Sequence, residues 1–204
     1  MKSDFPIGIF DSGIGGLTVA REITELMPQE KIVYYGDTLH LPYGQKSKQN
    51  IINYCSKICD FLTKKKCKAI IIACNTASSI ALNNIKNKVG DKYLIFNVID
   101  PVIKKISELK SNNIGIIGTN TTIESGVYEK KIKELEKKYI TSSLATPLLA
   151  PMIESGFHDA SIKKQIIATY LNHKKFKSID TLILGCTHYP LIKREISEIY
   201  NNKI

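Results

Sequence analysis

The sequence predicts an α/β protein built of two similar three-layer domains, with mainly parallel sheets and pseudo-symmetry about a central cleft. Three observations support this prediction. Short apolar runs alternate with helical patterns along the chain, as in parallel sheets covered by helices. The alternation starts again after Asp100-Pro101, and one apolar run in each half ends at a cysteine, Cys74 or Cys186. We therefore expect domains over residues 1–98 and 99–204.

In the first half, wholly apolar runs predict strands that are buried on both faces. Ser47 has the side chain of an N-cap, so a helix is expected to follow it. The residues after Cys74 are small or polar and can start the next helix. The expected strands cover residues 7–11, 31–36, 69–74 and 93–98, and the expected helices cover 17–27, 47–65 and 77–88.

The second half repeats this plan. The segment Ile114–Asn120 has the pattern of Ile7–Gly13, which indicates an internal repeat and two halves that face each other with one thiol on each wall of the cleft. The expected strands are 113–117, 140–144 and 181–184, and the expected helices are 102–109, 121–138, 161–173 and 190–200, with a short helix in the loop 146–156.

Composition narrows the classes of function. The net charge is +10, but only two of the 29 basic residues are arginines, and the lysines are scattered over helix faces. This favours a solvated surface over a nucleic-acid site. No apolar run approaches the roughly 20 residues of a membrane span, and the N-terminus is unlike a secretory signal, so we expect a cytoplasmic protein. The five cysteines should be reduced, and their spacing predicts no metal site.

The two strand-end cysteines indicate acid–base chemistry. A thiol beside a helix N-terminus is expected to have a lowered pKa, because the helix dipole favours the thiolate. One thiolate and one thiol on opposite sides of a small molecule can remove a proton from a carbon and return one to its other face, without a metal or cofactor. Backbone amides and nearby hydroxyls suit the stabilisation of the carbanion and the binding of carboxylates. The polar residues concerned are Ser12, Asn75, Thr76, Thr119 and Thr187.

Four motifs make the chain similar to a known family. They are FDSGIGG at 10–16, DTLHLPYG at 37–44, ACNTA at 73–77 and GCTHYPL at 185–191. Together they resemble the glutamate racemases of the cofactor-independent aspartate/glutamate racemase superfamily. The resemblance implies an isomerase that interconverts L- and D-glutamate with two cysteines, takes no cofactor and supplies D-glutamate for peptidoglycan. The histidine of GCTH favours glutamate, since the aspartate-type relatives usually have an acidic residue there.

The resemblance also implies roles for individual residues. Cys74 and Cys186 match the two acid/base thiols, and Asp11 matches the aspartate that assists the first. His188 and Glu154 match the pair beside the second thiol. The substrate-binding positions that match are Asp11, Ser12, Tyr43, Gly44, Asn75, Thr76, Thr119, Thr122, Thr187 and His188.

Other interpretations of these residues remain open at this stage. The two thiols could be buried core cysteines, and Asp11 a capping carboxylate. Glu154 could be a surface residue, Tyr43 could pack its ring under the loop, and His188 could be half of a metal pair. His40 has no expected partner.

Two alternative functions remain as well. One is a related racemase for aspartate or another small acid, and the other is a catalytically inactive form that binds a partner. Members of the family continue for several dozen residues and return to the first domain. We therefore expect the first domain to lack this return segment and to expose a sheet edge. We also expect a homodimer with a small-molecule substrate.

Overall fold

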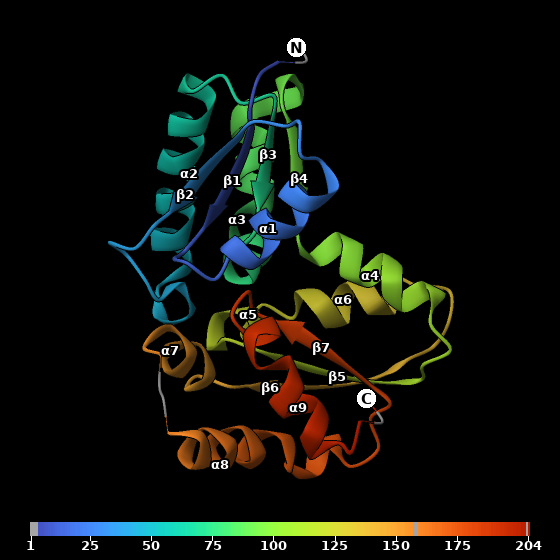
Figure 1. Cartoon of the computed structure of the whole chain (residues 1–204). Helices are drawn as coiled ribbons and strands as arrows, with labels where there is room; N and C mark the ends of the chain where they lie inside the picture. Colours follow the sequence, from blue (N-terminus) through green and yellow to red (C-terminus); the bar gives the residue numbers. More distant parts are fainter. Residues whose placement is uncertain (1–3, 157–158, 203) are drawn as a thin grey trace. The chain divides into compact units, whose positions relative to one another are not determined.

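The computed structural model describes residues 4–156, 159–202 and 204 (Figure 1). The chain divides into two compact units, Met1–Val98 and Ile99–Ile204. Each unit has its own parallel sheet. The two units are described one after the other.

The first unit is organised around a parallel sheet with the strand order β2-β1-β3-β4. Apolar residues fill the central strands, and β1 is buried throughout. Because all neighbours are parallel, the carboxyl ends of the strands meet at one edge. The strands are β1 (Ile7–Asp11), β2 (Ile32–Gly36), β3 (Ala69–Ile72) and β4 (Leu94–Asn97).

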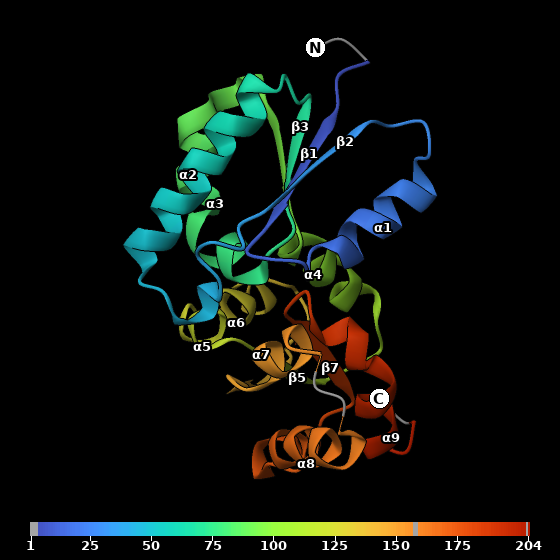
Figure 2. The ribbon, with the colours of Figure 1, turned by 60° about the vertical axis from the view of Figure 1, so that its left-hand side comes forward.

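Helices cover both faces of this sheet. In Figure 2, α1 (Leu17–Leu26) lies on one side, and α2 (Lys48–Lys64) and α3 (Asn75–Val89) lie together on the other. The core between the sheet and α2 and α3 contains fully buried side chains such as Ile51 and Ile70. Ser47 caps α2 as predicted, since its side chain accepts from the Asn50 N–H at 3.2 Å. The short 3₁₀ helices of this unit are η1 (Tyr43–Gln45) and η2 (Gly90–Lys92).

The second unit has the strand order β6-β5-β7. Its first strand is central, and the second and third strands flank it, as in β2-β1-β3 of the first unit. This shared order agrees with the internal repeat that the sequence indicates. The strands are β5 (Asn113–Gly118), β6 (Ile140–Ala145) and β7 (Thr181–Gly185).

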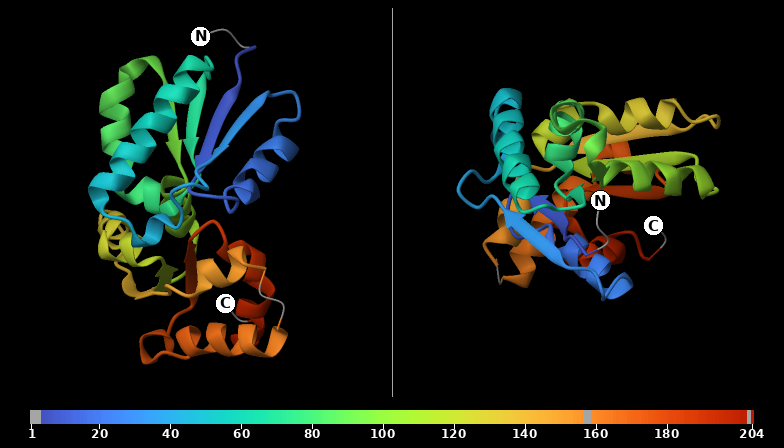
Figure 3. Two further views of the ribbon diagram at one scale, coloured as in Figure 1. Left: turned by 90° about the vertical axis from the view of Figure 1, so that its left-hand side faces the viewer. Right: turned by 90° about the horizontal axis from the view of Figure 1, so that it is seen from above.

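Helices also cover both faces of the second sheet. On one face, α4 (Ile99–Glu108) and α6 (Val127–Lys133) lie side by side over the core (Figure 3). On the other face the core is formed with α7 (Leu149–Glu154), α8 (Ala160–Leu171) and α9 (Lys193–Ile199). The prediction of two three-layer α/β folds is confirmed. The remaining elements are α5 (Asn120–Glu124), η3 (Lys174–Phe176) and η4 (Tyr189–Ile192).

Within the described ranges, no helix has both the length and the apolar character that a membrane crossing requires.

In the first unit, β4 is the outermost strand on one side of the sheet, and its residues Leu94 and Phe96 are 58% and 52% exposed. These two residues alternate with Ile95, so they share one face. The absence of a return segment from the first domain stays a prediction.

The prediction of one continuous helix over residues 121–138 is wrong. The structure has α5 and α6 instead, separated at Gly126, whose φ of +62° is left-handed. A residue in that conformation cannot continue a right-handed helix, and glycine adopts it without steric cost. The Ser125 hydroxyl also bonds the carbonyl of Thr122 at 2.6 Å and closes the last turn of α5.

Gly126→Ala tests this interpretation of the break. A Cβ at Gly126 would meet no atom within 4 Å, so only backbone strain should act. We expect the substitution to lower the free energy of unfolding by about 1 kcal/mol. Urea unfolding followed by circular dichroism measures the loss. Gly126→Asn is the matched control and should lose less, because asparagine tolerates the left-handed region. An alanine variant as stable as the wild type would contradict the explanation.

Candidate active site

Cys74 lies where β3 turns into α3. It has extended backbone angles, φ −69° and ψ 123°, and its sulfur caps the helix by accepting from the Ala77 N–H at 3.4 Å. The thiol also donates to the Ser12 hydroxyl, with 3.7 Å between Sγ and Oγ. Helix α3 therefore begins at Asn75, two residues earlier than predicted, because the cysteine itself is the N-cap.

Asp11 lies at the same edge of the sheet as Cys74. It is the last residue of β1, it is fully buried, and its carboxylate accepts from the Gly13 N–H at 3.0 Å. The ladder between β1 and β3 continues to the bond from the Ala73 N–H to the Phe10 carbonyl, so the carboxyl ends of these two strands lie side by side. We call Asp11, Ser12 and Cys74 the first thiol site.

A glycine makes room for the buried carboxylate. A Cβ at Gly16 would lie 2.4 Å from the Asp11 Cβ and 2.8 Å from the Tyr34 hydroxyl, closer than real atoms approach. Gly16 of the first motif therefore allows close packing against Asp11.

The expectation of a lowered pKa for the Cys74 thiol is wrong. Burial, and to a smaller extent the Asp11 carboxylate, raise its pKa to about 12. The hydrogen bonds with the Ala77 N–H and with Ser12 act in the opposite direction but are weaker. Burying a charged thiolate costs more free energy than its interaction with the helix N-terminus contributes. In this structure Cys74 is therefore a neutral thiol, which agrees with its donation to Ser12.

The other residues predicted in the first half lie near this edge. Asn75 and Thr76 open α3 and are buried, and Gly44 is buried in η1. Tyr43 opens η1, is 1% exposed, and its hydroxyl donates to the Asp37 carboxylate at 2.5 Å. Sequence reasoning missed Asp37, although it stands directly after β2 in the DTLHLPYG motif.

Sequence reasoning also found no partner for His40, and that was wrong. Its Nδ1 lies 2.8 Å from one Asp37 carboxylate oxygen and 3.0 Å from the other. The His40 ring also stacks on the ring of Tyr54 in α2, with 3.9 Å between centroids.

In the second unit, the structure brings together Cys186, His188 and Glu154. Cys186 directly follows β7, and its sulfur lies 3.6 Å from Nδ1 of His188. The other ring nitrogen of His188, Nε2, bonds the carboxylate of Glu154 at the end of α7. Cys186 and His188 are each 7% exposed. These three residues form a thiol–imidazole–carboxylate chain, which we call the second thiol site.

The prediction of one continuous helix over residues 190–200 is wrong. The next element after Cys186 is the four-residue 3₁₀ helix η4, and α9 starts only at Lys193. Pro190 stands in the first turn of η4, and the Tyr189 N–H bonds the Cys186 carbonyl at 3.2 Å. The second thiol is therefore accompanied by an imidazole, whereas Cys74 is accompanied by backbone and hydroxyl groups.

The threonines predicted in the second half lie at the same edge as Cys186. Gly118 and Gly185 are register partners, so the residues that follow β5 and β7 are neighbours. Thr119 caps α5 by accepting from the Thr122 N–H at 3.2 Å, and the two hydroxyls are 3.0 Å apart. Thr187, directly after Cys186, is buried.

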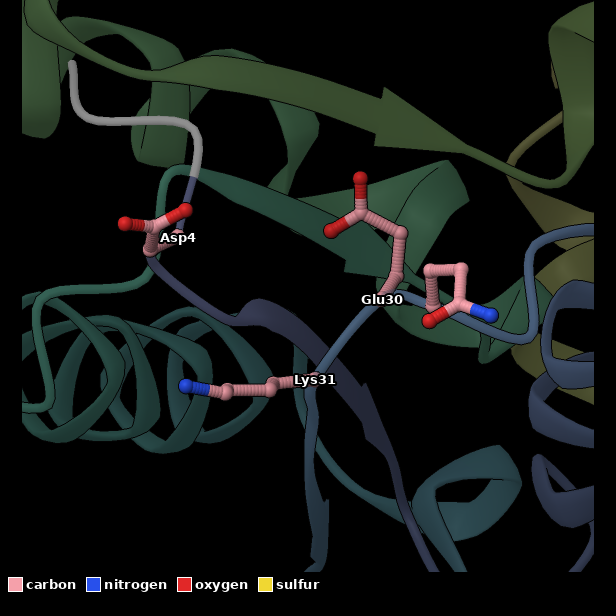
Figure 4. A pocket seen from close by; sticks show the side chains of 4 residues that line it. Asp4, Glu30 and Lys31 are labelled. Atoms are coloured by element: carbon pink, nitrogen blue, oxygen red, sulfur yellow. The ribbon is translucent and has the colours of Figure 1, made fainter.

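A small hollow of about 150 Å³ lies elsewhere on the first unit. It is lined by Asp4, Gln29, Glu30 and Lys31, at the end of the sheet where β1 and β2 begin (Figure 4). Glu30 is paired with Lys68 at 2.5 Å. This hollow contains none of the predicted site residues. In the residues that the structure describes, no group of three or more histidine, cysteine or acidic side chains could hold a metal ion.

Comparison with known proteins shows the family of the chain. Residues 15–203 match the family described as Asp/Glu/Hydantoin racemase. The chain belongs to this racemase family. It is 44% identical over 195 residues to glutamate racemase 3 of Caldanaerobacter subterraneus subsp. tengcongensis, which covers 95% of this chain and 70% of that relative.

Solved structures of glutamate racemases are similar over nearly the whole chain. The enzyme from Francisella tularensis, in complex with D-glutamate, has a TM-score of 0.90 at 38% identity and matches 96% of this chain and 73% of its own. The isoform RacE1 from Bacillus anthracis has a TM-score of 0.94 at 36% identity and matches 100% of this chain and 76% of its own.

The protonation of Cys74 can be tested by titration. Because burial raises its pKa to about 12, we expect no thiolate from Cys74 between pH 7 and about 10. The difference in ultraviolet absorbance between the wild type and Cys74→Ser, followed against pH, measures how much thiolate Cys74 forms. The same difference for Cys59→Ser is the control, since burial also raises that pKa to about 12. A Cys74 midpoint at or below about 8.5, the value of a free thiol, would contradict the prediction.

Proposed function

We propose that the chain interconverts L- and D-glutamate without a cofactor, with Cys74 and Cys186 as the two acid/base groups at the α-carbon. The observation that carries this proposal is the equivalence of the two cysteines. Each lies just after the third strand of the same three-strand order, Cys74 with one residue between it and the end of β3 and Cys186 immediately after β7. Each is also surrounded by groups that can exchange or orient a proton. Membership of the racemase family supports the reaction class.

The proposed reaction moves one proton at each face of the α-carbon. One thiolate accepts the α-proton, so that a Cα–H bond breaks and an S–H bond forms, and the electron pair stays on the substrate as a carbanion. The other thiol then donates its proton to the opposite face and becomes a thiolate. Hydroxyls and amides at the strand ends, such as those of Ser12 and Thr76, are proposed to bind the substrate carboxylates.

The first thiol must lose its proton before it can act as a base. Asp11 is proposed to accept that proton, because a charged carboxylate beside Cys74 opposes the thiolate and a protonated one does not. The ammonium group of the bound substrate would favour the thiolate as well. Asp11 is therefore proposed to assist Cys74 by becoming neutral when the thiol becomes a thiolate.

At the second thiol the proposed proton carrier is His188. Its Nδ1 faces the sulfur of Cys186, and its Nε2 faces Glu154, so the imidazole can take the thiol proton while the carboxylate stabilises the imidazolium. The hydrogen bond between His188 and Glu154 fixes the position of both side chains. Glu154 is thus proposed to orient the ring rather than to touch the substrate.

The proposal keeps the predicted organisation of the protein. It requires the thiols of two domains, residues 1–98 and 99–204, to reach opposite faces of one α-carbon across a cleft, and it includes a homodimer. The five cysteines are free thiols, which supports the reducing cytoplasm as the location. The D-glutamate formed there would supply peptidoglycan synthesis.

Proton exchange at the α-carbon tests the proposal directly. With L-glutamate, reductant and chelator in D₂O, we expect deuterium at the α-carbon and the formation of D-glutamate, followed by NMR and chiral chromatography. Cys74→Ser and Cys186→Ser should each lower turnover by about 100-fold or more in both directions, since each removes a general acid/base. The same assay with L-aspartate should be slower.

The control for these variants is Cys59→Ser, the same chemical change at a fully buried cysteine of α2, which should retain activity if it stays folded. Folded wild-type protein without exchange would refute the enzyme proposal. Normal rates in both catalytic variants would refute the two-thiol mechanism. Faster exchange on L-aspartate would favour the alternative substrate.

Glu154→Gln tests the role of the second thiol site. The amide cannot stabilise an imidazolium as a carboxylate does, so we expect kcat to fall about tenfold or more with a smaller change in KM. Steady-state rates in both directions measure this. Glu108→Gln, which removes an exposed ion pair with Lys105 at 3.3 Å, is the matched control and should leave kcat unchanged. A change in KM alone would contradict the assignment.

A further inference from the structure

The loop 37–45 contains a buried carboxylate that the proposed reaction does not use. Asp37 directly follows β2, and its side chain is 6% exposed. Its backbone N–H donates to the carbonyl of Asp11 at 3.0 Å, which continues the ladder between β1 and β2 by one residue. The loop thus starts beside the first thiol site.

The carboxylate of Asp37 is a shared acceptor for two side chains of its own loop. The Tyr43 hydroxyl donates to Oδ2 at 2.5 Å. The Nδ1 of His40 lies 2.8 Å from Oδ1 and 3.0 Å from Oδ2. Hydrogen bonds to a charged carboxylate are stronger than those between neutral groups. Asp37 therefore ties the start of the loop to its middle and to its end.

Helix α2 holds the same two rings from the other side. The ring of Tyr54 stacks on His40 with an interplanar angle of 21°, and its centroid lies 5.8 Å from that of Tyr43. The Lys46 N–H bonds the Tyr43 carbonyl at 3.1 Å and closes η1. The rings are thus held between a carboxylate and an aromatic side chain.

Tyr43 is a neutral donor close to Cys74. Burial raises the pKa of its hydroxyl, and the bond to Asp37 and the nearby Cys55 and Cys74 sulfurs raise it further. Without Asp37, this hydroxyl would be a buried donor that has lost its acceptor, which is costly. The position of Tyr43 therefore depends on Asp37.

We propose that Asp37 is a positioning residue for the reaction, because its carboxylate holds the Tyr43 hydroxyl and thereby fixes the Tyr43-Gly44 backbone beside the first thiol site. The inference rests on the proposed function, together with the substrate-binding roles that the resemblance implies for Tyr43 and Gly44. Both oxygens of Asp37 are engaged by Tyr43 and His40, so its proposed role is to hold the loop rather than to touch the substrate.

Kinetics of four variants test this role. Asp37→Ala and Tyr43→Phe should each raise KM for both enantiomers of glutamate by about tenfold, with kcat within about threefold of the wild type, because binding rather than proton transfer is affected. The double variant should be no worse than the more affected single variant, since Asp37 acts through Tyr43. Asp37→Asn keeps an acceptor oxygen and should recover most of the lost affinity.

Ile7→Val is the control for a loss of stability alone. Ile7 is a buried residue at the start of β1, in a different core cluster from Tyr43, and its variant should keep the wild-type KM. An equal rise in KM in this control would overturn the inference. So would additive effects in the double variant, or a fall in kcat at unchanged KM.

Hydrogen exchange separates this inference from the proposed function. The amides of His40 and Lys46 are bonded within the loop, to the carbonyls of Asp37 and Tyr43. Asp37→Ala should speed their exchange, and Ile7→Val should not. If the wild type does not racemise glutamate, the proposed function fails, yet exchange still decides whether Asp37 holds the loop. Unchanged exchange in an active enzyme would overturn the positioning role alone.

Tyr43→Phe provides a second test in case Asp37→Ala does not fold. It removes only the hydroxyl and keeps the ring packed against Tyr54. Its exchange at Lys46 should also become faster than in the wild type. If Asp37→Ala is unfolded and Tyr43→Phe exchanges at the wild-type rate, the inference is overturned.

Discussion

The parallel pairing of β1 with β3 places a carboxylate and a thiol at one edge of the first sheet. Asp11 ends β1, and Cys74 follows β3, so the pairing Phe10–Ile72 sets where both functional groups emerge. Antiparallel strands would send these ends to opposite edges. The second sheet applies the same constraint through the pairing of Gly118 with Gly185, which brings Thr119 near Cys186.

Burial then determines the chemical state of the groups at that edge. At Cys74, the loss of water outweighs the hydrogen bonds with the helix N-terminus and with Ser12, so the thiol is neutral. At Cys186 the sulfur faces an imidazole that is held by Glu154. Two cysteines with the same place in the topology therefore have different partners. A reaction that runs in both directions can use two different bases, because each acts at its own face of the substrate.

Sequence patterns predicted the helices and strands better than the breaks within them. Apolar runs predicted the central strands β1 and β5, because burial on both faces leaves a clear signal. The break at Gly126 was missed, since a single glycine in a pattern rich in glutamate and lysine is compatible with a continuous helix. The roles of Asp37 and His40 were missed as well. Their partners lie three and six residues away in an irregular loop, where no period relates spacing to contact.

By itself, the sequence determined the strands, the internal repeat, the positions of Cys74 and Cys186 and the resemblance to a racemase family. These follow from local hydrophobicity and from motifs, which are properties of contiguous residues. Only the tertiary structure decided that Cys74 is a neutral thiol, that Glu154 reaches His188, and that Asp37 holds Tyr43. Desolvation and hydrogen bonding depend on which groups fold against one another, and chain position alone does not specify that.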